Sequence, residues 1–121
     1  MKVLLALILV LAGCKHEEPT SNANMSPAER GKQAYQQRGC VACHSLDGSQ
    51  LIGPSFKGVY LSEVKLADGT QIKADEAYLK ESIETPMAKT VRGFSPTMPS
   101  FKGQLTDEQI QDLIAFIKSV Q

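Results

Sequence analysis

Two cysteines and a histidine at residues 40 to 44 limit what this chain can fold into more than any other feature of the sequence does. The segment is Cys40-Val41-Ala42-Cys43-His44. Two thiols one helical turn apart can each form a thioether with a vinyl group on one edge of a haem, and the histidine can then turn its imidazole to the iron. Cys-x-x-Cys-His is the sequence mark of covalent, c-type haem attachment. We therefore expect one haem c joined to Cys40 and Cys43, with His44 as an axial ligand.

Three other interpretations of the cysteine pair remain open. A redox-active Cys-x-x-Cys of the thioredoxin type belongs beside a βαβ pattern, which this sequence lacks. Half of a zinc site would need a second Cys pair or a second His in the same domain, and the chain has only three Cys and two His. A structural disulfide is the third possibility. Export from the cytoplasm favours haem, because c-type haem is attached on the exported side of the membrane.

The N-terminus predicts export and lipidation. Residues 3–12 form an apolar run after Met1-Lys2, about half of the roughly 20 residues that span a bilayer, so a removable signal is favoured over a membrane helix. The run ends in Leu-Ala-Gly-Cys14, which resembles the signal of bacterial lipoproteins. That resemblance implies a signal peptide at 1–13, acyl chains on Cys14 and stable attachment to a membrane. An ordinary secretion signal with a chance cysteine is the alternative.

A polar tether is expected at 14–25, because this stretch after the lipidated cysteine has no apolar period. His16 lies in the tether and is expected to be a solvated residue. The folded domain is then 26–121, about the size of one domain. Loss of Lys2 with the signal leaves 12 Lys plus Arg from the original 13, against 13 Asp plus Glu, a net charge of −1. Nothing here indicates nucleic-acid binding, which depends on a basic surplus.

The domain begins with a helix signal. Ser26 precedes Pro27 and stands three residues before Glu29, which is a capping box with proline at the first helical position. A helix is predicted from about Pro27 to Gln37, ending before Gly39.

The same capping pattern recurs near the C-terminus at Thr106 and Gln109. A stripe of apolar residues at helical spacing follows it and predicts a long amphipathic helix facing the core. The stripe consists of Ile110, Leu113, Ile114, Ile117 and Val120.

Two shorter elements are expected between these helices. A helix is predicted from Asp75 to about Thr85, where Pro86 ends it. Alternating residues on both sides of Asp68-Gly69 predict a β-hairpin over 64–73.

The second axial position of the iron can be filled by methionine or left open. Met98 lies between Pro96 and Pro99, and prolines stiffen a loop enough to hold a weakly bonding thioether at the iron. Met98 is therefore the predicted ligand. Met87 follows Pro86 at a helix end, where a solvent-facing or core methionine is the ordinary expectation. A His/Met pair raises the haem potential.

From Ala28 to Val120 the chain resembles class I c-type cytochromes, and in particular the cytochrome c domain fused to subunit II of some bacterial haem–copper oxidases. The matching segments are Gly-Cys-Val-Ala-Cys-His-Ser-Leu-Asp-Gly (39–48), Gly-Pro-Ser-Phe-Lys-Gly (53–58), Leu-Ala-Asp-Gly-Thr (66–70), Ala-Asp-Glu-Ala-Tyr-Leu (74–79) and Met-Pro-Ser-Phe-Lys-Gly-Gln-Leu (98–105). The resemblance implies an all-α cytochrome c fold, with N- and C-terminal helices packed together around a covalent haem and a small β-hairpin insertion. The membrane hairpin and copper-binding domain of that subunit are missing here.

The resemblance also implies the surroundings of the haem. In c-type cytochromes the carbonyl of a proline at the position of Pro54 accepts the proton of the ligand His44 and fixes its orientation; a simple turn is the alternative. Plausible walls of the haem pocket are Phe56, Tyr60, Tyr78, Leu79, Phe94 and Phe101.

A one-electron carrier outside the inner membrane is the expected function. The implied acceptor is a cytochrome oxidase or another terminal reductase, and the implied donor is a quinol–cytochrome c reductase or another cytochrome. We expect a monomer, located in the periplasm or on the outer side of the cytoplasmic membrane, and no enzymatic activity. The alternatives are a haem peroxidase or gas sensor with an open iron site, and a fixed cytochrome subunit of a respiratory complex.

Overall fold

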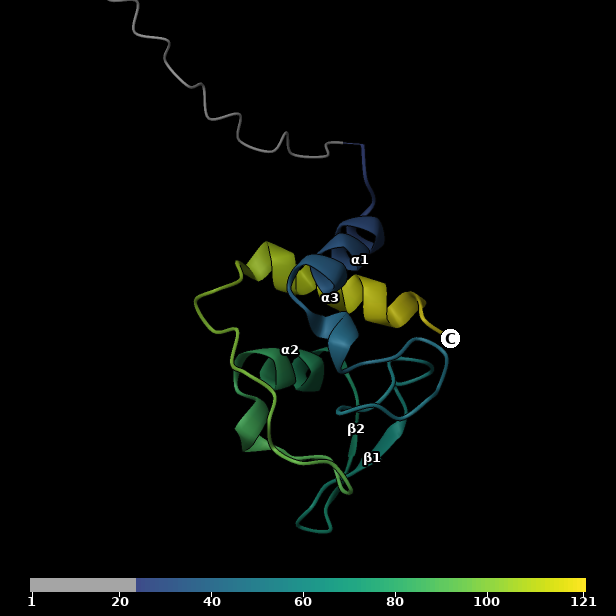
Figure 1. Ribbon diagram of the computed structural model, residues 1–121, viewed down its shortest axis with the longest axis vertical. Coiled ribbons are helices and arrows are strands. Elements are labelled where there is room, and N and C mark those ends of the chain that lie inside the picture. Colours follow the sequence, from purple (N-terminus) through teal and green to yellow (C-terminus); the bar gives the residue numbers. More distant parts are fainter. Residues whose placement is uncertain (1–23) are drawn as a thin grey trace, which may run out of the picture.

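The computed structural model describes residues 24–121, in which a pair of crossed helices lies above a third helix, a hairpin and several loops (Figure 1). The elements in chain order are α1 Pro27–Gln37, the 3-10 turn η1 Cys40–Ala42, β1 Glu63–Lys65, β2 Gln71–Lys73, α2 Glu76–Glu84, the 3-10 turn η2 Pro86–Ala88 and α3 Asp107–Ser119. The predicted signal peptide, Cys14 and all but the last two residues of the predicted tether lie outside the described residues. Within 24–121, no helix has the length and apolar character needed to cross a bilayer.

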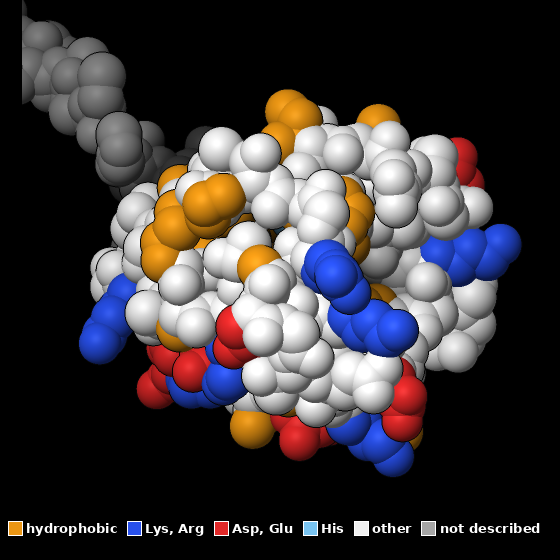
Figure 2. Space-filling view, turned by 90° about the horizontal axis from the view of Figure 1, so that it is seen from below, with side chains coloured by type: hydrophobic (Ala, Val, Ile, Leu, Met, Phe, Trp, Pro, Cys, Tyr) orange, Lys and Arg blue, Asp and Glu red, His pale blue; other side chains and the backbone are white. Residues whose placement is uncertain are grey.

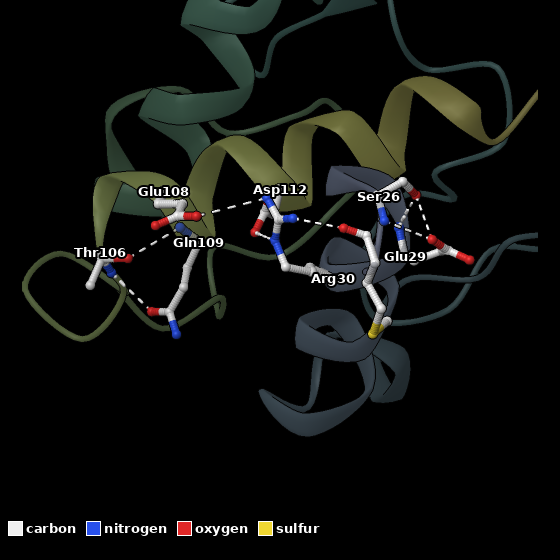
Figure 3. A network of polar contacts seen from close by, with 8 residues as sticks. Ser26, Glu29, Arg30, Thr106, Glu108, Gln109 and Asp112 are labelled. Atoms are coloured by element: carbon white, nitrogen blue, oxygen red, sulfur yellow. Dashed lines mark hydrogen bonds and ion pairs between the residues drawn. The ribbon is translucent and has the colours of Figure 1, made fainter. Parts of the chain in front are cut away.

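Both capping boxes form as predicted. The backbone N–H of Ser26 donates to the Glu29 carboxylate at 2.7 Å, and the N–H of Glu29 donates back to the Ser26 hydroxyl. The backbone N–H of Thr106 donates to the Gln109 side-chain oxygen at 3.0 Å, and the return bond is present as well. Figure 3 shows the two boxes at the starts of α1 and α3. These reciprocal bonds satisfy backbone donors that would otherwise have no partner in the first helical turn.

Helices α1 and α3 cross in close contact at Gly31. A β-carbon built on Gly31 would lie 1.9 Å from the backbone oxygen of Asp112, so only glycine permits this approach of the two backbones. Four residues of the predicted apolar stripe, Ile110, Leu113, Ile114 and Ile117, are buried in the main core, and Val120 packs partly buried against it. The core residues are Tyr35, Leu79, Ile83, Leu105, Ile110, Leu113, Ile114, Phe116 and Ile117.

An ion pair joins the same two helices. The guanidinium of Arg30 makes two hydrogen bonds of 2.7 Å to the carboxylate of Asp112, which is buried, and a third of 2.9 Å to the backbone oxygen of Met25 (Figure 3). On the exposed side of this pair, a carboxylate oxygen of Glu108 lies 3.8 Å from the Arg30 guanidinium. The bidentate geometry compensates the burial of the Asp112 charge and fixes where the chain enters α1.

The predicted hairpin is present, with one addition. Strands β1 and β2 are antiparallel, with Val64 opposite Ile72. The addition is the segment 90–92, which pairs with the outer side of the hairpin: Leu66 bridges Val91, and the N–H of Arg92 donates to the Lys65 oxygen at 2.9 Å. Because of this pairing, the hairpin holds the start of the loop that carries Met98.

Candidate haem site

One apolar cavity collects the predicted site residues. Its volume is about 320 Å³, and Cys40, Cys43, His44, Pro54 and Met98 all line it. The remaining walls come from α2, η2, the loops on either side of the hairpin, and the buried face of α3. Figure 2 views the molecule from the side of η2 and the hairpin, and shows exposed hydrophobic side chains beside a hollow in the surface. A cavity of this size and lining is typical of a cofactor site.

The turn after α1 presents both cysteines to this cavity. Gly39 adopts a left-handed conformation with φ of 78°, which lets the chain leave α1 and enter η1 at once. The N–H groups of Cys43 and His44 both donate to the Cys40 oxygen, at 3.1 and 2.9 Å. Cys40 and Cys43 are half-buried free thiols with no disulfide between them. Burial raises the pKa of the Cys40 thiol, so it is protonated at neutral pH.

His44 is held as a neutral ring. Its Nδ1 lies 2.7 Å from the backbone oxygen of Pro54. Because a carbonyl oxygen only accepts, Nδ1 carries the proton and donates it, which leaves Nε2 with a free lone pair. Burial lowers the pKa of the imidazole, although the bond to Pro54 acts in the opposite direction. A neutral imidazole with a free Nε2 is the form that binds a metal.

The surroundings of His44 leave its ring little freedom. A β-carbon on Gly53 would lie only 2.6 Å from Cε1 of the ring. The ring of Phe56 stacks on the imidazole with centroids 4.7 Å apart and an interplanar angle of 21°. The hydroxyl of Tyr35 donates to the backbone oxygen of His44 at 2.5 Å. Gly53 belongs to the segment around Pro54, and Tyr35 lies within the predicted first helix; neither position carries a sequence signal that would have linked it to His44.

Met98, the predicted ligand, lines the cavity, and Met87 lines it as well, which the sequence did not predict. Met98 is half-buried, whereas 57% of Met87 is exposed. The loop around Met98 is tied back to α2 by the N–H of Phe101, which donates to the Ile83 oxygen at 3.1 Å. The difference in burial favours Met98 as the methionine that faces a bound group.

Five of the six predicted wall residues line the cavity: Phe56, Tyr78, Leu79, Phe94 and Phe101. The exception is Tyr60, for which the prediction was wrong. Its ring packs against the main core and lies under the ammonium of Lys118, 4.9 Å from the ring centroid. Sequence reasoning also missed two cations in the lining, Arg38 and Lys89.

The residues present suit a haem c. Two free thiols on one turn, a neutral imidazole with a free nitrogen and a thioether all line the same apolar cavity. Thiols attach a haem covalently through its vinyl groups, and imidazole with thioether is an established ligand pair for haem iron. The fold and the site therefore define a single-haem protein with covalent attachment.

Comparisons with known proteins agree with the assignment of a covalently attached haem. The family model described as cytochrome c matches residues 28–121. Cytochrome c6 of Leptolyngbya boryana is 31% identical over 78 residues, which cover 64% of this chain and 75% of that protein. The structure of cytochrome cH from Methylobacterium extorquens matches with a TM-score of 0.56 and 26% identity, over 76% of this chain and 97% of that one.

The chain belongs to the cytochrome c family. Residues 24–121 have the cytochrome c fold, with three α-helices and a small two-stranded sheet, as the sequence predicted. Membership implies one covalently bound haem c per chain and a role in electron transfer.

Proposed function

We propose that this protein is a lipid-anchored carrier of single electrons that works outside the inner membrane and delivers them to a terminal oxidase. The observation that carries the proposal is the geometry of His44, a buried neutral imidazole whose Nδ1 proton is engaged by Pro54 while its Nε2 stays free. Together with Cys40 and Cys43 on the preceding turn, it forms a prepared attachment site.

Each residue has a separate role in this proposal. Cys40 and Cys43 hold the haem, which supplies a one-electron Fe(III)/Fe(II) couple when bound. His44 and Met98 would hold the haem iron, and Pro54 positions the ring of His44. Electron transfer moves no proton and no heavy atom, so the site needs no acid, base or nucleophile. The apolar lining excludes water and gives the haem a low-dielectric surrounding.

The choice of an oxidase as acceptor is supported by the resemblance to the domain fused to oxidase subunit II. That resemblance includes the Leu-Ala-Asp-Gly-Thr segment at 66–70. In the structure this segment includes the turn of the hairpin, and it pairs with the strand segment that leads to Met98. A quinol–cytochrome c reductase or another cytochrome is the proposed donor.

The acceptor is tested by mixing reduced holoprotein with oxidase-containing membranes of the source bacterium. We expect rapid oxidation of the haem at the expense of oxygen, blocked by cyanide. Oxidation that is slow, or that cyanide leaves unchanged, would contradict an oxidase as the acceptor while leaving the electron-carrier role intact.

The anchor is supported by the Leu-Ala-Gly-Cys14 segment. It is tested by fractionating cells that express the full chain or Cys14→Ser. The haem protein should move from the membrane to the soluble periplasmic fraction in the variant. Retention of Cys14→Ser on the membrane would contradict lipid attachment.

A further inference from the structure

Ser55 lies between the two residues that contact the ring of His44 from the following loop. On one side of it in the chain is Pro54, whose backbone oxygen lies 2.7 Å from Nδ1 of the imidazole. On the other side is Phe56, whose ring stacks on the same imidazole with centroids 4.7 Å apart. Whatever fixes the backbone at Ser55 therefore fixes both of these contacts.

The Ser55 hydroxyl makes every hydrogen bond that a hydroxyl can make. It has one proton to donate and two lone pairs that accept. The proton goes to the backbone oxygen of Ser45 at 3.1 Å. The backbone N–H groups of Gly48 and Lys57 both donate to the hydroxyl oxygen, each at 3.1 Å. One side chain thus joins the residue after His44 to two other points of the loop.

The bond to Ser45 continues a regular pairing of two segments, 43–45 and 53–55. The N–H of Gly53 donates to the backbone oxygen of Cys43 at 2.8 Å. The next pair along the chain is His44 with Pro54, and the one after it is Ser45 with Ser55. The Ser55 hydroxyl therefore closes the pairing on the far side of the bond that orients His44.

Loss of this hydroxyl should loosen the loop without unfolding the domain. The backbone oxygen of Ser45 keeps a second bond, from the N–H of Phe56 at 2.9 Å. Gly48 and Lys57 are exposed, so water can replace the serine at their N–H groups. The main consequence is a less firmly held Pro54 carbonyl.

We propose that Ser55 is a positioning residue for His44 and that its hydroxyl, acting through Pro54, helps to set the reduction potential of the haem. The inference rests on the proposed function, in which His44 binds the iron, and adds a residue to it. A hydrogen bond from Nδ1 makes the imidazole a stronger donor, and a stronger donor favours Fe(III). A Pro54 carbonyl that is held less firmly weakens this bond and raises the potential.

The test compares full-length holoprotein with three substitutions of Ser55. Ser55→Ala removes the hydroxyl. Ser55→Thr and Ser55→Val form a matched pair of nearly the same shape, of which only threonine keeps a hydroxyl. The pair carries the test even when Ser55→Ala yields little holoprotein. Ser49→Ala is the control, because Ser49 is exposed and its hydroxyl donates to Asp47 rather than to the 53–56 segment.

Three quantities are measured: the reduction potential, the rate at which the His44 Nδ1 proton of the reduced protein exchanges with deuterium, and the midpoint of thermal unfolding. The first comes from a spectroscopic titration and the second from NMR of nitrogen-15-labelled protein. In Ser55→Ala and Ser55→Val, we expect the equilibrium constant for reduction to rise about threefold, or about 28 mV at 59 mV per tenfold. The Nδ1 proton should exchange at least about fivefold faster, because exchange requires its hydrogen bond to open. Ser55→Thr and Ser49→Ala should match the wild type in both quantities.

A purely structural role would lower the midpoint of thermal unfolding in Ser55→Ala and leave the potential and the exchange rate unchanged; that result would overturn the proposal. Equal changes in Ser55→Thr and Ser55→Val would overturn it too, because the hydroxyl would then not be the cause. The proposed function fails in a different way. A wild type without a titratable covalent haem would contradict that function before any variant is compared.

Discussion

Gly53 packs so closely against the imidazole of His44 that a β-carbon at this position would lie 2.6 Å from Cε1 and 2.9 Å from Nδ1. The backbone of Gly53 is itself fixed, because its N–H donates to the Cys43 oxygen at 2.8 Å. The next residue, Pro54, provides the carbonyl that accepts the Nδ1 proton. Backbone atoms on one short loop therefore set both the position and the tautomer of the proposed ligand.

Gly53→Ala should displace the His44 ring. The added methyl group has to push the imidazole or its own loop aside, and overpacking of this kind costs about 1–3 kcal/mol. We expect a lower yield of holoprotein and a lower midpoint of thermal unfolding, measured by visible absorption and circular dichroism. Gln50→Ala, an exposed change in the same loop, is the control. Wild-type yield and stability in Gly53→Ala would show that His44 does not need this close contact.

Met98→Ala should open the iron and lower the reduction potential, because a thioether ligand favours Fe(II). The reduced variant should bind carbon monoxide at neutral pH, whereas the reduced wild type should not. Met87→Ala is the matched control, since Met87 lines the same cavity but is mostly exposed; its visible spectrum should be unchanged. The reverse pattern would assign the ligand to Met87, and ready binding of carbon monoxide by the wild type would favour a gas sensor or peroxidase.

The sequence predicted the features that depend on neighbouring residues. Each capping box joins residues three positions apart, and each helix starts where its box predicts. The hairpin follows from the Asp68-Gly69 turn in the same way. Cys40, Cys43 and His44 could be proposed as the haem attachment residues because the attachment chemistry requires them to be close together in the sequence.

Contacts between distant parts of the chain were not predicted. Arg30 and Asp112 are 82 residues apart, and many charged residues in this sequence are equally plausible partners. The pairing of Leu66 with Val91 depends on where the loop after α2 returns. The placement of Met87 at the cavity and of Tyr60 away from it was not predicted either, because only the packed core decides which side chains face the cavity.

Asp112→Asn should weaken the contact between α1 and α3. The new amide would place a donor opposite the Arg30 guanidinium, where the buried carboxylate now accepts two bonds of 2.7 Å. We expect the midpoint of thermal unfolding to fall by about 5 °C or more, the scale of a lost charged hydrogen bond in a domain of this size.

Glu108→Gln is the matched control for this change. Glu108 approaches the same guanidinium at 3.8 Å, but 80% of its side chain is exposed. Exposed ion pairs of this kind contribute little to stability, so the midpoint of thermal unfolding should hardly change. An equal effect of the two substitutions would contradict a special role for the buried carboxylate.

Stability should decline in acid below about pH 4.5, the ordinary pKa of glutamate. Hydrogen bonds from the Ser26 backbone and hydroxyl lower the pKa of Glu29, and a hydrogen bond from Lys80 lowers that of Asp107. A carboxylate with a lowered folded-state pKa stabilises the fold above its unfolded pKa, and this contribution is lost as the pH falls through the folded value. Thermal unfolding between pH 3 and 7 measures the decline. It should be shallower in Glu29→Gln than in the wild type, and identical slopes would contradict a lowered pKa for Glu29.

The most direct test of the account is the mass of the intact protein purified from a host that attaches haem to Cys-x-x-Cys-His segments. The wild type should carry the mass of one haem that denaturation does not remove, and a variant with both Cys40→Ala and Cys43→Ala should lose it. A wild-type mass that corresponds to polypeptide and acyl groups alone would contradict the account.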